Sequence, residues 1–230
     1  MKTIGLIGGM SWESSLEYYR IINETVKEHL GGLHSAKNIM YSFDFSEIQV
    51  LQNQGKWEEI ADLMVEAAQK LESYGAELII ICSNTIHLIA ESISTNISIP
   101  LIHIIDTTVE QIKKNEIQKI GLLGTKFTME KDFYRKILEE KYSLSVIIPE
   151  TKDREIIHNI IFNELVKGEI KEDSKIKYLK IIKELEKKGA EGVILGCTEI
   201  PMLISQQDVD IPVFDTTAIH ARAAVLYALD

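Results

Sequence analysis

The sequence predicts an α/β protein with two pseudo-symmetric lobes, each a mainly parallel sheet flanked by helices. Short apolar runs alternate with helix-spaced apolar residues along the 230-residue chain. Three segments of the first half also recur, in the same order, in the second half. In both halves one apolar run starts after a glycine and ends in small polar or nucleophilic residues. No linker-like stretch separates the halves, so we expect two closely packed lobes.

The clearest repeat pairs residues 75–87, GAELIIICSNTIH, with residues 189–201, GAEGVILGCTEIP, at a gapless offset of 114. IGLIGG from Ile4 returns as IGLLGT from Ile120, and the segment from Ile99 returns from Ile211, at offsets of 116 and 112. Such regular spacing indicates a duplicated lobe of about 115 residues. We predict a first lobe of residues 1–98 plus 212–230 and a second lobe of residues 99–211.

The elements of the first half follow from apolar spacing and capping signals. Ser11 or Ser14 can cap the first helix, and Gly31 ends it. In chain order we predict a strand over 3–9, a helix to about residue 30, a strand over 39–45, a loop with Gln52, a helix over 57–74, the first repeated strand, a helical stretch over 87–94, a strand over 99–105 and a further helix.

The second half restarts the pattern at Lys119. Here we predict a strand to residue 125, helices over roughly 128–140, 154–167 and 174–188, a strand near 144–149, the second repeated strand, a strand from Ile211 and a last helix.

The composition excludes several classes of protein. A hydrophobic fraction of 45% and a charged fraction of 26% are typical of a globular protein with a sizeable core. The net charge of −10 argues against nucleic acid and anionic membranes as partners. No apolar run approaches the ~18 residues of a membrane span, and the N-terminus does not resemble a signal peptide. The 2 cysteines suggest no disulfide framework, and no cluster has zinc spacing, so we expect a reduced, cytoplasmic protein without a metal.

The residues after the two repeated strands are the candidates for chemistry. Ligands of parallel sheets bind beyond the carboxyl ends of the strands, so two related lobes would bring Ser83 and Cys197 to one cleft from opposite sides. A thiol and a hydroxyl across a ligand suit proton removal and return at carbon. Cysteine is the better base, because its ordinary pKa is about 8.5 and nearby donors can lower it. Backbone N–H groups and the side chains of Asn84, Thr85 and Thr198 can stabilise a carboxylate whose α-carbon becomes carbanion-like.

Other reactive side chains have simpler interpretations. Neighbouring strand residues point to opposite faces, so Cys82 is expected to pack in the core if Ser83 faces the cleft. A capping or supporting role is favoured over catalysis for His87 and His220. Gly8-Gly9 lacks the motifs of a phosphate loop, which favours a tight turn that offers the Met10 N–H to a substrate.

Five blocks of sequence resemble the aspartate/glutamate racemase family, and the resemblance extends over nearly the whole chain. The blocks are IGLIGGMS from Ile4, CSNTIH from Cys82, Gly124-Thr125, GCTEIP from Gly196 and FDTTAIH from Phe214. The resemblance implies racemisation without a cofactor, in a cleft between two lobes, with one cysteine base from each lobe. Cys197 matches the second of these cysteines. Typical members have Cys-Asn-Thr where this chain has Ser83 before Asn84, as in the subfamily with a hydroxyl residue there, which is associated with acidic amino acids.

The resemblance also implies a set of substrate contacts, namely Met10, Gln52, Ser83, Asn84, Thr85, Thr125, Thr198 and Glu199. We therefore predict a racemase for aspartate or glutamate, without pyridoxal phosphate, in which Cys197 and Ser83 are catalytic. Lys126, Arg154 and Lys167 are the candidate cations for the side-chain carboxylate. The alternatives are a one-cysteine decarboxylase of malonate-like acids and a non-catalytic amino-acid-binding protein. The expected partner is a small amino-acid substrate, with no nucleic acid or membrane, and a homodimer is allowed for.

Overall fold

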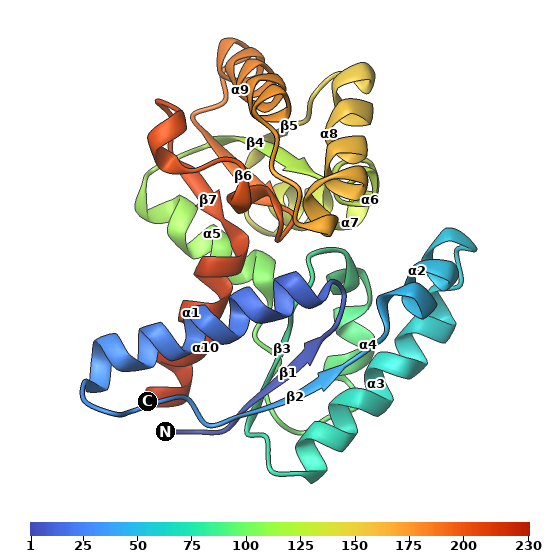
Figure 1. The fold of residues 1–230 in the computed structure, drawn as a ribbon, viewed down its shortest axis with the longest axis vertical. Helices are drawn as coiled ribbons and strands as arrows, with labels where there is room; N and C mark the ends of the chain where they lie inside the picture. Colours follow the sequence, from blue (N-terminus) through green and yellow to red (C-terminus); the bar gives the residue numbers. More distant parts are fainter. The chain divides into compact units, whose positions relative to one another are not determined.

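The computed structural model describes residues 1–230, which form two compact units. The first unit contains Met1–Ile104 and Thr217–Asp230, and the second contains Ile105–Thr216. The boundaries predicted from the sequence lie a few residues earlier in the chain. Each unit has a parallel sheet flanked by helices, which confirms the predicted α/β class (Figure 1).

The first unit contains a parallel sheet in the order β2-β1-β3. Alternate residues of its strands pack on two sides: Leu6 and Ile80 belong to the cluster with α1 and α10, whereas Ile7 and Ile81 belong to the cluster with α2, α3 and α4. The elements are β1 (Ile4–Gly8), α1 (Trp12–Leu30), β2 (Asn38–Ser42), α2 (Phe45–Asn53), α3 (Trp57–Ser73), β3 (Leu78–Ile81), the 3-10 helix η1 (Thr85–Ile89), α4 (Ala90–Ser94) and α10 (Thr216–Leu229).

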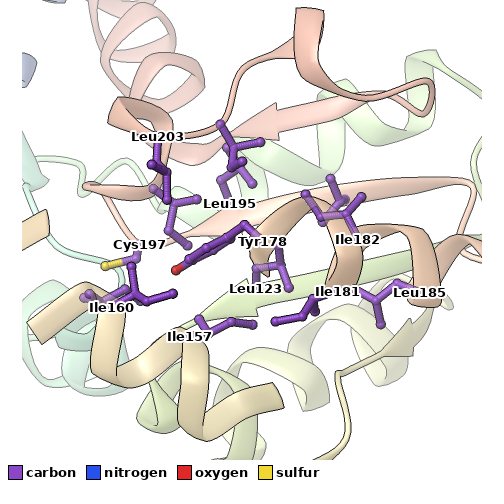
Figure 2. Packing of buried hydrophobic residues seen from close by; sticks show 14 of the residues in the cluster. Leu123, Ile157, Ile160, Tyr178, Ile181, Ile182, Leu185, Leu195, Cys197 and Leu203 are labelled. Carbon is purple, nitrogen blue, oxygen red and sulfur yellow. The ribbon is translucent and has the colours of Figure 1, made fainter. Parts of the chain in front are cut away.

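The second unit contains a parallel sheet in the order β5-β4-β6-β7. One buried cluster joins Val193, Leu195 and Cys197 on one side of β6 to helices α8 and α9 (Figure 2). The elements are α5 (Ile104–Lys114), β4 (Lys119–Gly124), α6 (Lys126–Glu130), α7 (Asp132–Lys136), the π-helical turn η2 (Ile137–Lys141), β5 (Ser145–Ile147), α8 (Thr151–Asn163), η3 (Leu165–Lys167), α9 (Glu172–Lys187), β6 (Gly192–Gly196), η4 (Ile200–Met202), η5 (Gln206–Asp208) and β7 (Val213–Asp215).

The repeated segments occupy equivalent places in the two sheets. Ile7 pairs with Ile81 in the first unit, and Leu123 pairs with Leu195 in the second, as the offsets of the repeat require. Equivalent side-chain contacts flank these ladders, since Glu77 Oε2 accepts from the Thr3 N–H at 2.7 Å and Glu191 Oε2 accepts from the Lys119 N–H at 3.0 Å. The duplication therefore extends to strand register.

Glycines make the close approach at the end of the β4–β6 ladder possible. Gly124 and Gly196 are paired there, and a β-carbon on Gly124 would lie 2.9 Å from the Gly196 carbonyl oxygen. The reciprocal contact, from a β-carbon on Gly196 to the Leu123 carbonyl oxygen, would also be 2.9 Å. Real β-carbons do not approach other atoms this closely, so any side chain at either position would push β4 and β6 apart just before Cys197.

Four expected elements differ in the structure. The strand over 39–45 ends at Ser42, because Asp44 caps α2 by accepting from the Ser46 N–H at 2.9 Å. Gln52 consequently lies on α2 and not in a loop. The strand over 99–105 is reduced to one parallel bridge between Ile79 and Leu101. The helix over 128–140 is divided into α6, α7 and η2.

None of the helices combines the length and the hydropathy that a membrane span requires.

Candidate active-site residues

Ser83 follows the first repeated strand and is 8% exposed. Its neighbour Cys82 is fully buried in the cluster with α1 and α10, as the alternation of strand residues predicts. Burial raises the pKa of the Cys82 thiol far above its ordinary value. Cys82 is therefore a neutral packing residue, and Ser83 is the side chain that remains partly accessible.

The loop after β1 is held against the end of β3 by serine side chains. Ser11 caps α1 by accepting from the Ser14 N–H at 3.3 Å. Of the two caps that the sequence allows, Ser11 and not Ser14 is therefore the one used. Ser14 Oγ donates to the Cys82 carbonyl at 3.0 Å, and Ser15 Oγ accepts from the Gly9 N–H at 2.8 Å. Gly9 has φ +88°, and a β-carbon there would meet the Phe43 backbone at 2.2 Å. Only glycine fits this turn, which brings Met10 next to the strand ends.

His87 supports the backbone of Ser83. Its Nε2 accepts from the Ile104 N–H at 3.2 Å, so the proton of the neutral ring is on Nδ1, which donates to the Ser83 carbonyl at 2.7 Å. Burial lowers the pKa of His87 well below its ordinary value, and the nearby His103 and His220 rings lower it further. Both ring nitrogens are used, which fits the supporting role expected from the sequence.

His220 has a similar supporting arrangement. It lies between the Tyr18 hydroxyl, 2.8 Å from Nδ1, and the Ile102 carbonyl, 2.8 Å from Nε2. Burial lowers its pKa to about 4, so the ring is neutral at pH 7.

The other predicted contact residues of the first unit are buried or half-buried. Met10, Asn84 and Gln52 are buried, with exposures of 5%, 3% and 8%, and Thr85 is half-buried.

Cys197 is in the second unit, at the place that corresponds to Ser83. Ser83 comes two positions after Ile81, which pairs with Ile7, and Cys197 comes two positions after the equivalent residue Leu195, which pairs with Leu123; both are 8% exposed. Cys197 Sγ donates to Glu199 Oε2 at 2.9 Å, and Thr198 Oγ1 donates to the same oxygen at 2.8 Å. The sequence suggested Glu199 only as a substrate contact, whereas the structure makes it the hydrogen-bond partner of the thiol.

The surroundings of Cys197 favour the neutral thiol. Burial raises the pKa of the Cys197 thiol well above its ordinary value, and the Glu199 carboxylate raises it further. The backbone N–H groups of Thr198 and Glu199 lower it, but they do not outweigh burial. The nearby donors therefore do lower the Cys197 pKa, but burial and Glu199, which the sequence-based expectation left out, raise it by more.

Thr125 follows β4 and caps α6 by accepting from the Thr128 N–H at 3.3 Å. Of the three candidate cations, Lys126 forms an ion pair with Glu155, and Arg154 forms one with Glu130 at 2.8 Å. Lys167 is exposed and has no ion pair. No group of three or more His, Cys, Asp or Glu residues has the arrangement of a metal site.

One buried polar side chain near Cys197 was not singled out from the sequence. Tyr178 occupies an inward position of α9 among apolar residues, so its helical spacing predicts only packing. The structure shows that its hydroxyl is buried and has no hydrogen-bond partner.

Comparisons with known proteins show the family to which the chain belongs. Residues 7–224 match the model of the Asp/Glu/Hydantoin racemase family. The broad-specificity amino-acid racemase RacX of Bacillus subtilis is 25% identical over 175 residues, which are 73% of this chain and 72% of RacX.

Two solved structures match over the full length of both chains. One is a Yersinia pestis protein provisionally assigned as an Asp/Glu racemase, with 54% identity and a TM-score of 0.94. The other is an aspartate racemase homologue from Pyrococcus horikoshii, with 42% identity and a TM-score of 0.89. The chain therefore belongs to the Asp/Glu/Hydantoin racemase family of isomerases.

Proposed function

We propose that this protein racemises an acidic amino acid, aspartate or glutamate, by removing and returning the α-proton without a cofactor. The observation that carries the proposal is the equivalence of Ser83 and Cys197, each placed two residues after an equivalent paired residue of a duplicated sheet, Ile81 and Leu195. Racemisation needs one proton-transfer group on each face of the α-carbon, and the duplication supplies one such group from each unit.

Glu199 gives Cys197 a route to the thiolate form. The thiol proton already lies in a hydrogen bond to Glu199 Oε2, so its transfer creates a thiolate and a neutral carboxyl group. An arriving amino acid carries an α-ammonium group, whose positive charge favours the thiolate and opposes the effect of burial. The thiolate can then take the α-proton, and the Ser83 hydroxyl can deliver a proton to the opposite face.

The substrate carboxylates need donors. In the proposal, the Met10 N–H and the Asn84, Thr85 and Thr125 side chains meet the α-carboxylate, which holds the developing negative charge. Gln52 supplies a further side-chain amide, and Thr198 lies next to the proposed base.

Proton NMR of amino acids in deuterium oxide tests the function. We expect the α-proton signal of aspartate or glutamate to disappear, together with a loss of optical rotation, while basic and neutral amino acids exchange much more slowly. Release of carbon dioxide from a disubstituted malonate would instead identify a decarboxylase. Stabilisation by an amino acid without exchange would identify a binding protein.

Lys167 is the cation that we assign to the side-chain carboxylate of the substrate. Lys126 and Arg154 already form ion pairs, whereas Lys167 has none and lies two residues after Leu165, a member of the Cys197 cluster. Lys167→Met is expected to lower kcat/KM for the acidic substrate about tenfold, mostly through KM, because a hydrogen bond to a charged group is lost.

Lys126→Met is the matched control, because it removes a lysine that is paired with Glu155. It should leave KM close to that of the unchanged protein. Equal effects of the two variants on KM would contradict the assignment of Lys167.

A further inference from the structure

Tyr178 carries a buried hydroxyl that nothing in the resting protein uses. The residue is fully buried on α9, and its hydroxyl oxygen has no hydrogen-bond partner. Leaving a buried hydroxyl unpaired costs free energy, whereas phenylalanine would fill the same apolar space without that cost. The hydroxyl therefore requires an explanation beyond packing.

The Tyr178 ring extends through the apolar cluster toward the candidate base. Figure 2 shows the ring among Leu123, Leu195 and Ile160, with its oxygen on the side of the Cys197 sulfur. Cys197, Glu199 and Glu164 are the titratable groups that act on this hydroxyl. The first two share the hydrogen bond of the proposed base, and Glu164 accepts from Ser174 Oγ at 2.6 Å.

This setting keeps Tyr178 a proton donor. Burial raises the pKa of Tyr178 well above its ordinary value, and the nearby acidic groups raise it further. The hydroxyl is consequently neutral at pH 7. A neutral O–H with no partner, facing a group that must become an anion, is a preorganised stabiliser of that anion.

Resting on the proposed function of Cys197, we propose that Tyr178 is a positioning residue that donates a hydrogen bond to the Cys197 sulfur once the thiol proton has moved to Glu199. No proton leaves Tyr178 in this step: the S–H bond breaks, an O–H bond forms on Glu199, and the sulfur lone pair accepts from the phenol. When the thiolate takes an α-proton, the hydrogen bond from Tyr178 is released. The residue acts through Cys197 and touches no substrate atom.

The test compares Tyr178→Phe with its parent in a Cys82→Ala background, where Cys197 is the only cysteine. The rate at which iodoacetamide alkylates Cys197, measured against pH, reports the thiolate. If Tyr178→Phe raises the Cys197 pKa by about one unit, the thiolate fraction falls about tenfold at any pH below that pKa. A thiolate of higher pKa is also more nucleophilic, which offsets part of this loss, so alkylation should slow about threefold to tenfold. In Tyr178→Phe, the rise of the α-proton exchange rate on the acid side of its pH profile should move to a pH about one unit higher. The exchange rates of the variant and its parent should become equal at high pH.

Ile181→Val is the control for repacking, because Ile181 lies on the same helix and in the same cluster without a polar group. It should lower Tm by about 2–4 °C while leaving alkylation and the pH profile unchanged. Tyr178→Phe should show the opposite pattern, with Tm unchanged or raised.

The inference is overturned if Tyr178→Phe alkylates and exchanges like its parent. It is also overturned if the exchange rate falls equally at every pH together with Tm, because that pattern indicates a structural role. If the unchanged protein exchanges no amino acid, the proposed function fails, but the alkylation comparison still decides the role of Tyr178.

Discussion

Replacing Cys197 with alanine is expected to slow α-proton exchange by about 10²–10⁴-fold, because the variant loses its proposed proton-transfer group. Glu199 and Thr198 keep each other as hydrogen-bond partners, since Thr198 Oγ1 donates to Glu199 Oε2 at 2.8 Å. Thermal unfolding and circular dichroism should therefore show a folded protein with a modestly lower Tm. Exchange is measured by the α-proton signal of the acidic substrate in deuterium oxide.

Cys82→Ala is the matched control for Cys197→Ala. Both changes remove a buried thiol, but Cys82 packs between α1, α10 and the sheet of the first unit. We expect Cys82→Ala to lower Tm and to exchange at close to the unchanged rate. If Cys82→Ala abolished exchange while Cys197→Ala did not, the assignment of the base would be wrong.

The duplication could be predicted from the sequence because its offsets are regular. Three segments with offsets of 112 to 116 are enough to align two sheets, and the paired ladders at Ile81 and Leu195 confirm the alignment. The equivalence of Ser83 and Cys197 follows directly from this register. Short-range patterns of polar residues after a strand therefore located the candidate groups without any knowledge of packing.

The strand over 99–105 could not be predicted correctly, because its apolar residues satisfy two patterns. Ile104 and Ile105 read as the end of a strand, yet they also begin the helical spacing that continues with Val109 and Ile112 in α5. The helix extends over Ile104–Lys114, which leaves only Leu101 to bridge to Ile79. The equivalent segment of the second unit, Val213–Asp215, is a strand that pairs with β6.

The protonation of Cys197 could not be predicted because burial is a property of the whole unit. The backbone donors after the strand are visible in the sequence, but their effect is smaller than that of burial and Glu199. Tyr178 is nineteen positions before Cys197 in the sequence and meets it only through the packing of α9 on β6. Sequence spacing carries no signal for such a contact.

Replacing Ser83 with alanine is expected to stop inversion while leaving exchange on one face of the substrate. A serine hydroxyl accepts a proton far less readily than a thiolate, but it can deliver one. By family resemblance we expect Cys197 to face the α-hydrogen of the L-enantiomer. In the unchanged protein, L-substrate should then exchange its α-proton for deuterium faster than it inverts, and D-substrate should exchange slowly. In Ser83→Ala, inversion should fall about 10²–10⁴-fold while exchange of the L-substrate persists.

Ser83→Cys provides the opposite change and should accelerate inversion, because it places a thiol on the second face. The measurement follows α-proton loss from pure L- and pure D-substrate alongside optical rotation for all three proteins. The enantiomers have equal free energy in water, so kcat/KM for inversion must be the same in both directions, and only exchange can reveal which base is weaker. Equal exchange rates for the two enantiomers in the unchanged protein, each matched to inversion, would show two competent bases and would contradict the assignment of Ser83 as the weaker one.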